Sequence, residues 1–271
     1  EPWLTALCQS EHLSVLLGSG LSNAVHRMGV GSLLPGMAAA GFGDFDGLIG
    51  EEAERSANAA GREKGNIEDQ IRVANELLRG FQILGSSNEK AAAKSVSLNS
   101  ALKTVLSSFA TSILKGEQGL LTADEEAREQ AFNYLVSFLM SFASRTGTRD
   151  RLHIFTTNYD RFIEAGAEVA GLHLLDRFVG SIAPIFRSSR LDLDLHYNPP
   201  GIRGEPRYLE GVARFTKLHG SLDWLDAESN IRRLGIPFGA SDLTPFLQVA
   251  GATAAEATQL MIYPNAAKDR E

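Results

Sequence analysis

The chain has 271 residues, of which 44% are hydrophobic and 22% are charged, and its formal net charge at pH 7 is −7. Its length is ample for a hydrophobic core, because chains of about 300 residues bury roughly 75% of their unfolded surface. The acidic balance argues against a broad basic face, so we expect no direct binding of nucleic acid and no binding to anionic membranes.

The cysteine content excludes several further classes of protein. Cys8 is the only cysteine, so the chain cannot hold an internal disulfide, a four-cysteine zinc ribbon or a Cys-x-x-Cys redox motif. We therefore expect no metal, a simple buried or surface thiol at Cys8, and a reducing medium. No run of about 18 apolar residues indicates a membrane helix, and residues 1–4 do not begin a signal peptide. Together these features predict a cytoplasmic protein. The chain lacks an initiator methionine, so we expect it to be processed, trimmed or a fragment.

The first predicted unit is a strand, a glycine turn and a helix. Residues 13–17 are a short apolar run that stops at residues 18–20, Gly-Ser-Gly, which is typical of a buried parallel strand. A helix is predicted over residues 21–28. Residues 29–50 contain seven glycines and one proline, so they are predicted to be an irregular loop. Because glycine lowers the cost of rearrangement, our hypothesis is that this loop acts as a gate.

Residues 51–146 have a helical pattern instead. Asn66 precedes an acid-rich first turn, as the N-cap of a helix does. Apolar residues then recur every three or four positions over 67–81, and the same spacing returns over 98–113 and 127–142. The range is predicted to be a block of three to four helices without a strand.

Strand character returns after the helical block. Residues 152–156 form a second apolar run, which breaks at residues 157–160, Thr-Asn-Tyr-Asp. A helical pattern follows from Phe162, and Gly171 is predicted to end that helix.

The last third of the chain has weaker patterns. Residues 191–197 alternate apolar and polar, as an exposed or edge strand does. Residues 207–218 form an extended stretch that ends at residues 219–221, His-Gly-Ser, and residues 261–264 are a last short strand candidate.

These strand-turn-helix units predict an α/β fold with a parallel, Rossmann-like sheet and no zinc ribbon. Residues 1–50 and 147–271 are predicted to form this domain, with its C-terminal part incomplete, and residues 51–146 to form a helical subdomain inserted into it. Ligands of such folds bind beyond the carboxyl ends of the strands. Three predicted strands end in polar or glycine-bearing turns, which is the main functional signal of the sequence.

The first of these turns has the composition of a phosphate site. Gly18 and Gly20 would let backbone N–H groups approach a phosphate at the start of the following helix, and Ser19 and Ser22 could add hydroxyl donors. The alternative is a structural strand-to-helix turn, which uses glycine for its geometry alone. The third glycine of the dinucleotide fingerprint and the lysine of the P-loop are absent.

The other two turns carry hydrogen-bonding and acid–base groups. Asn158 offers donors and an acceptor without charge, which suits a sugar hydroxyl or a water, and Asp160 could accept from an amide or a hydroxyl. Alternatively, both residues cap the following helix. His219 titrates near neutral pH and could act as a general base, or it is a structural histidine.

One further group of polar residues has two interpretations. Asp192, Asp194 and His196 fall on one face of the strand predicted over residues 191–197. They could bind a cation. The solvated face of an edge strand has the same pattern, and this second interpretation is favoured.

The three turns together resemble the sirtuin superfamily. Sirtuins carry a Gly-Ala-Gly-Ile-Ser turn, a Gln-Asn-Ile-Asp turn and a Leu-His-Gly segment in this order, and here the sequences are Gly-Ser-Gly-Leu-Ser at 18–22, Thr-Asn-Tyr-Asp at 157–160 and Leu-His-Gly at 218–220. With Thr156, the second turn looks closer to the sirtuin-like NAD-hydrolase domains of bacterial antiphage defence than to histone deacetylases.

The resemblance implies chemistry at the bond between nicotinamide and ribose, with NAD⁺ as the substrate. It implies that Asn158 holds the ribose or the attacking water, that Asp160 faces the nicotinamide amide, and that His219 takes a proton. The remaining site residues would bind the dinucleotide, with the first four around its pyrophosphate: Gly18, Ser19, Gly20, Ser22, Thr157, Tyr159, Gly220 and Ser221.

The chain departs from the sirtuin deacylases in ways that bear on the reaction. One cysteine cannot build their zinc ribbon, and only Pro35 remains of their Pro-Asp-Phe-Arg segment. Water is therefore the expected acceptor, which gives nicotinamide and ADP-ribose and, in antiphage defence, depletion of NAD⁺. The alternatives are an NAD-dependent ADP-ribosyltransferase or deacylase, and a non-catalytic nucleotide-binding sensor or assembly subunit. The resemblance also implies a homo-oligomer and a second defence subunit such as an ATPase.

Overall fold

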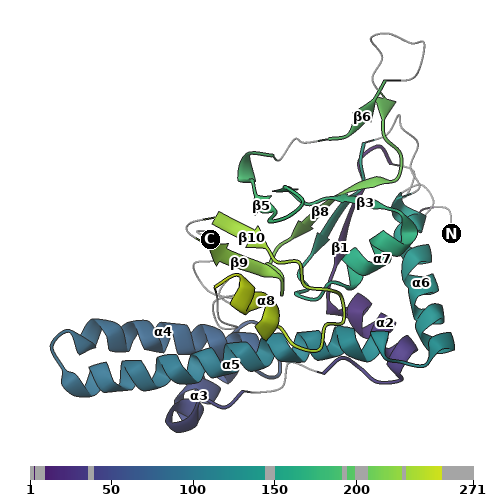
Figure 1. The fold of residues 1–271 in the computed structure, drawn as a ribbon. Coiled ribbons are helices and arrows are strands. Elements are labelled where there is room, and N and C mark those ends of the chain that lie inside the picture. The colour runs from purple at the N-terminus through teal and green to yellow at the C-terminus, as the bar shows by residue number, and fades with distance from the viewer. Residues whose placement is uncertain are drawn as a thin grey trace.

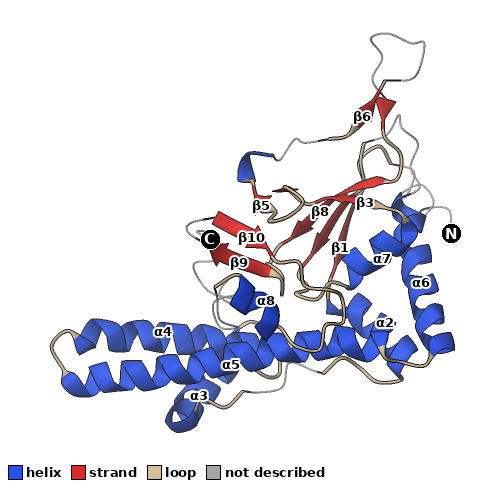
Figure 2. Ribbon diagram, viewed as in Figure 1, coloured by secondary structure: helices blue, strands red, loops and turns tan. Residues whose placement is uncertain are grey.

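The computed structural model describes residues 3, 10–35, 40–143, 150–190, 194–198, 207–227 and 230–251. Over these ranges the chain forms a parallel sheet with helices packed beside it, a smaller antiparallel sheet and a two-stranded ribbon (Figures 1 and 2). Cys8, Asp192 and the strand predicted over residues 261–264 lie outside the described residues.

The elements follow one another in an α/β order. In chain order they are β1 (Ser14–Leu17), α2 (Ser19–Val30), the 3₁₀ helix η1 (Gly43–Phe45), α3 (Asp46–Ala59), α4 (Ile67–Gly85), α5 (Glu89–Leu121), α6 (Glu125–Ala143), β2 (His153–Thr156), α7 (Phe162–Ala170), β3 (His173–Leu175), β4 (Phe178–Val179), β5 (Ile185–Phe186), η2 (Ser188–Arg190), β6 (His196–Tyr197), β7 (Arg207–Tyr208), β8 (Val212–Lys217), β9 (Trp224–Ala227), β10 (Asn230–Arg233) and α8 (Thr244–Val249).

The central sheet has four strands in the order β1-β2-β8-β3, and every neighbouring pair is parallel. Leu17 of β1 is in register with Thr156 of β2, which is in register with Lys217 of β8. The carboxyl ends of these three strands therefore lie together at one edge of the sheet. The predicted α/β fold with a parallel sheet is confirmed at this level.

Glycine ends the two helices that follow the first two strands. Gly31 after α2 has φ 81°, and Gly171 after α7 has φ 67°. This left-handed conformation is easily adopted only by glycine, which is why it so often terminates helices. The predicted strand-turn-helix units at both positions are confirmed.

Two hydrophobic clusters form the core of the described residues. One joins the parallel sheet to α2, α6 and α7, and the other joins α3, α4 and most of α5 to α8. Helix α5 contributes to both, because its residues from Leu98 to Leu114 lie in the second cluster and Leu120 lies in the first. In Figure 1, α4 and α5 form a hairpin that projects away from the sheet.

The structure corrects the predicted boundary of one loop. The loop predicted over residues 29–50 is too long, because η1 begins at Gly43 and α3 begins at Asp46. Phe42, Phe45 and Ile49 are buried at helical spacing, and their burial outweighs the weak helix propensity of the glycines among them. Helix α6 lies inside the predicted insertion 51–146, yet it packs against α2 and α7 beside the sheet.

The antiparallel sheet β4-β5-β10-β9 was not predicted. Its short strands are held by aromatic side chains: Trp224 of β9 contacts Phe178 and Phe186, with ring centroids 5.2 and 5.9 Å apart. The guanidinium of Arg233 lies 4.8 Å from the centre of the Phe178 ring and pairs with Asp176. Such a sheet depends on contacts between distant segments, which a local pattern does not indicate. Strands of two residues are also too short to show an alternation of apolar and polar residues.

The strand predicted over residues 191–197 is shorter where it is described. Strand β6 comprises only His196 and Tyr197, paired with β7. Asp194 lies outside the strand, and its carboxylate binds Arg151 at 2.8 Å and Arg214 at 3.6 Å. The favoured interpretation of a solvated strand face is wrong for Asp194, because its side chain is only 7% exposed and pairs with these arginines.

Candidate functional site

A cavity of about 310 Å³ lies at the carboxyl ends of β1, β2 and β8, where the three predicted motifs meet. Six residues from those motifs line it. Its other walls come from the segment after α2, from the start of α4 and from the middle of α5. The lining residues are Ser19, Asn23, Leu34, Pro35, Asn66, Glu68, Phe109, Ser112, Ile113, Thr157, Asn158, Tyr159, Asp160 and His219.

The amide of Asn158 is held in one orientation. Its Nδ2 donates to the backbone oxygen of Gly18 at 3.0 Å and to Oγ of Ser22 at 2.8 Å. A carbonyl oxygen can only accept, so the contact with Gly18 identifies the nitrogen side of the amide. Both N–H groups are used inside the protein. Oδ1 is therefore the atom that Asn158 can offer to a molecule in the cavity, as an acceptor.

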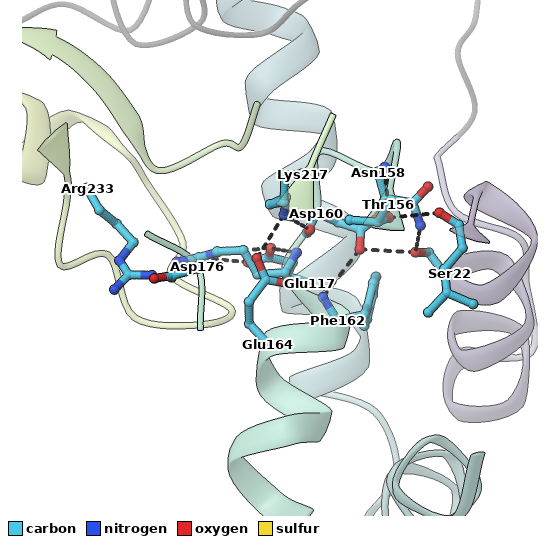
Figure 3. Close-up of polar contacts among 12 residues, drawn as sticks. Ser22, Glu117, Thr156, Asn158, Asp160, Phe162, Glu164, Asp176, Lys217 and Arg233 are labelled. Carbon is cyan, nitrogen blue, oxygen red and sulfur yellow. Dashed lines mark hydrogen bonds and ion pairs between the residues drawn. The ribbon is translucent and has the colours of Figure 1, made fainter. Parts of the chain in front are cut away.

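The hydrogen bonds continue from Ser22 to Asp160 (Figure 3). The Ser22 hydroxyl donates to Oδ1 of Asp160 at 3.0 Å, and the same oxygen accepts from the backbone N–H of Phe162 at 3.3 Å. Ser22, expected at the pyrophosphate, is fully buried and does not line the cavity. It connects the first motif to the second, and Asp160 also accepts from the N–H of the first residue of α7.

Charges are buried beneath these strand ends. Burial raises the pKa of Asp160, although Lys217, Ser22 and the Phe162 N–H oppose the rise. Nζ of Lys217 donates to the backbone oxygen of Asp160 at 2.5 Å and to Oε1 of Glu164 at 2.9 Å. Burial also raises the pKa of Glu164 to about 7, against the attraction of Lys217. Lys217 therefore joins the turn between β2 and α7 to Glu164 of that helix (Figure 3).

A second buried ion pair joins α7 to the helical block. The guanidinium of Arg161 binds both carboxylate oxygens of Glu117 on α5, at 3.1 and 2.6 Å, and Oε1 also accepts from the Arg161 backbone N–H at 2.9 Å. The remaining guanidinium contacts are the backbone oxygens of Ile236 and Pro237. Glu117 is inaccessible to solvent. These bonds fix α5, and with it one wall of the cavity, to the end of β2.

His219 and Tyr159 face each other across the two later motifs, with ring centroids 5.9 Å apart. The Tyr159 hydroxyl donates to Oε1 of Glu68 at 2.7 Å. The tyrosine ring also meets Phe109 edge to face, at 5.5 Å between centroids. His219 thus lies beside an aromatic wall that ends in a carboxylate.

The other predicted site residues have different positions. Ser19 and Thr157 line the cavity, whereas Ser221 is fully buried and absent from its lining. Gly220 has φ 76°, a conformation that lets the chain turn directly after His219. Gly18 and Gly20 also do not line the cavity. A Cβ at Gly20 would meet nothing within 4 Å, so the first turn of α2 has open space beside it.

Comparison with known proteins identifies no relative. The sequence matches no family model, and no curated protein is significantly similar to it.

No metal centre is formed by the part of the chain that the structure describes, where three or more His, Cys, Asp or Glu side chains nowhere gather in a suitable group. Within the same residues, no helix combines the length and apolar character needed to cross a membrane.

The residues that sequence reasoning missed are those of the helical walls. Glu68 and Asn66 lie at the start of α4, where the cap of the helix was predicted but not its place beside the cavity. Phe109, Ser112 and Ile113 of α5 carry only the signal of a helix with one apolar face. Nothing local to these positions indicates that they meet a turn on the sheet, because that contact depends on the tertiary fold.

Proposed function

We propose that this chain is an NAD⁺ glycohydrolase. The bond between ribose C1′ and the nicotinamide nitrogen breaks, its electron pair stays on the nitrogen, and a water oxygen bonds to C1′. The products are nicotinamide, ADP-ribose and one proton. Nicotinamide leaves as a neutral ring, so the reaction needs no general acid, and its transition state resembles an oxocarbenium ion, as in other glycoside cleavages.

One observation carries the proposal. Residues of all three motifs, from strand ends far apart in the sequence, line a single cavity that also contains a histidine and an oriented amide. Ligands of α/β folds bind at this edge of the sheet. A structural turn, a helix cap and a structural histidine would not need to converge on the same space.

The contacts give each group a role in this reaction. Oδ1 of Asn158 would accept a hydrogen bond from a ribose hydroxyl or from the attacking water. His219 would take the proton that either group loses. Ser19 and the open first turn of α2 would bind the pyrophosphate, because backbone N–H groups at a helix start favour anions.

Asp160 has an indirect part in this scheme. Its Oδ1 holds Ser22, and Ser22 accepts from the Asn158 amide, so the carboxylate would position Asn158. Asp160 also lines the cavity, which leaves its expected contact with the nicotinamide amide as part of the proposal.

The proposal also includes water as the acceptor of the ADP-ribosyl group and a role in antiphage defence. The single cysteine removes the zinc ribbon of the deacylases, which favours water over an acyl-lysine as the acceptor. The resemblance to sirtuin-like defence domains supports a role in antiphage defence by depletion of cytoplasmic NAD⁺. It also supports action as a homo-oligomer with a second subunit such as an ATPase.

Product analysis tests this function. The full-length protein is incubated with NAD⁺, and nicotinamide, free ADP-ribose and protein-bound ADP-ribose are measured. We expect nicotinamide and free ADP-ribose in equal amounts, with kcat lowered about 100-fold or more in Asn158→Ala and His219→Ala, because positioned acid–base groups contribute about 10²–10⁴-fold.

Exposed His173 provides the matched control. His173→Ala should retain the activity of the unaltered chain. If protein-bound ADP-ribose forms instead of free ADP-ribose, the reaction is ADP-ribosyl transfer and not hydrolysis. NAD⁺ left intact by the protein, alone and with its partner subunit, would reject catalysis and favour a sensor.

A further inference from the structure

The helical wall of the cavity carries a carboxylate that adjoins the second sheet motif. Glu68 lies in the first turn of α4 and is partly buried at the cavity. Its Oε1 accepts the Tyr159 hydroxyl at 2.7 Å. A carboxylate has two oxygens with about four lone-pair sites, so this bond uses only part of its capacity to accept. Neither the sequence motifs nor the proposed reaction assigns Glu68 a role.

Aromatic rings adjoin this carboxylate. Tyr159 and Phe109 both line the cavity, and their rings meet edge to face at 5.5 Å. Aromatic faces attract cations through their electron density, most strongly where water is excluded. A carboxylate next to such rings is the combination that binds planar or quaternary cations.

No lysine or arginine lines the cavity among the residues that the structure describes. Three cationic residues are near Glu68 in sequence, and none of them lines the cavity. Arg62 binds Asp69 through both terminal nitrogens, at 2.6 and 2.8 Å, Arg72 binds Glu76 at 3.0 Å, and Lys64 is exposed. The Arg62 side chain is 45% exposed and lies outside the cavity lining. A ligand with its own positive charge would therefore reach Glu68 in a cavity whose described lining residues include no lysine or arginine.

We propose that Glu68, with the rings of Tyr159 and Phe109, recognises the positive charge of the ligand and selects a pyridinium nucleotide over its neutral, reduced form. The inference rests on the proposed function, because NAD⁺ supplies that charge on its nicotinamide ring. NADH shares the ribose, pyrophosphate and adenosine of NAD⁺, so the charge and the associated ring geometry separate the two ligands.

The charge also explains the kinetic effect expected of Glu68. In the ground state the positive charge lies on the nicotinamide ring, and as the C1′–N bond breaks, this charge moves to the ribose. A carboxylate in the same small cavity attracts both states. Such uniform binding lowers KM and changes kcat little.

A binding measurement tests the inference independently of turnover. The full chain with His219→Ala, which suppresses cleavage, is titrated with NAD⁺ and with NADH in a calorimeter. We expect NAD⁺ to bind about tenfold more tightly than NADH, a ratio equivalent to roughly 1.4 kcal/mol. Adding Glu68→Gln should reduce the ratio to about twofold or less. Glutamine has nearly the same shape and can still accept the Tyr159 hydroxyl, so the change removes charge and little else.

Glu63→Gln is the matched control, because Glu63 is exposed, close in sequence and outside the cavity lining. It should keep the tenfold ratio. In the chain with an intact His219, Glu68→Gln should raise KM for NAD⁺ about tenfold and change kcat less than about threefold.

The two proposals fail in different ways. If the chain hydrolyses NAD⁺ but binds NAD⁺ and NADH equally, or if Glu68→Gln leaves their ratio unchanged, the role of Glu68 is wrong and the hydrolase stands. If NAD⁺ binds preferentially through Glu68 but is never cleaved, the recognition stands and the hydrolase is wrong. Binding of neither nucleotide would overturn both.

Discussion

The cavity wall that comes from the strand ends is held by hydrogen bonds, whereas the wall that comes from the helices is held by apolar packing. Asn158, Ser22 and Asp160 are linked in series, and each donor has a defined acceptor. On the helical side, Phe109 is 5% exposed within a cluster of hydrophobic side chains. Hydrogen bonds set the direction of a polar atom, while packing sets only the position of a surface. The sheet side is thus suited to orienting reacting groups and the helical side to enclosing them.

The strongest test of this comparison removes the link between the two walls. Glu117→Ala would leave Arg161 buried without its carboxylate. We expect the free energy of unfolding to fall by about 3–5 kcal/mol, the usual cost of breaking a buried ion pair. Urea unfolding followed by circular dichroism measures the change.

Glu126→Ala, at an exposed position on α6, is the control and should shift stability by less than about 0.5 kcal/mol. A similar small shift for Glu117→Ala would mean that the ion pair does not hold the two walls together.

A smaller effect is expected from breaking the hydrogen-bond series itself. Ser22→Ala removes the acceptor of one Asn158 N–H and the donor to Asp160. Leaving buried partners unsatisfied costs about 1–3 kcal/mol. Because Asn158 can then rotate, kcat for NAD⁺ cleavage should fall about tenfold while KM changes little. Unfolding in urea and steady-state kinetics provide the two measurements.

Ser100→Ala, at an exposed position on α5, should change neither quantity. An unaltered kcat in Ser22→Ala would show that Asn158 is oriented without the serine.

The smallest effect is a pH dependence of stability from Glu164. Its pKa of about 7 in the folded chain lies above the ordinary value of 4.5, so between these values the folded state binds more protons than the unfolded state. Stability from this group therefore falls as pH rises from about 4.5 to 7. Partial exposure screens the effect, which we expect to be on the order of 1 kcal/mol.

Glu164→Gln should remove that slope. Unfolding free energies at pH 5 and pH 8, compared between the variant and the unaltered chain, measure it. If the unfolding free energy changes equally with pH in both proteins, a group other than Glu164 is responsible for the pH dependence.

Features that depend only on neighbouring residues could be predicted from the sequence. The apolar runs before Gly18 and Thr157 predict parallel strands, and Gly171 predicts a helix end. The start of α3 fell in the predicted loop, because the glycines around Phe45 and Ile49 obscured their helical spacing. The contact between Glu68 and Tyr159 spans 91 residues. No local pattern carries such a contact, and it arises only when the helical hairpin packs onto the sheet. The family resemblance, which no family model or curated protein supports, stays a prediction.

Helix α5 sets a constraint on how this chain can vary in length. Its 33 residues form one continuous helix of roughly 50 Å. It runs from the tip of the hairpin, past the cavity at Ser112, to Leu120 beside the sheet. One residue inserted before the cavity would rotate the two ends by about 100° relative to each other. The hairpin can therefore lengthen or shorten without cost to the cavity only at its tip, and in matched whole turns of α4 and α5.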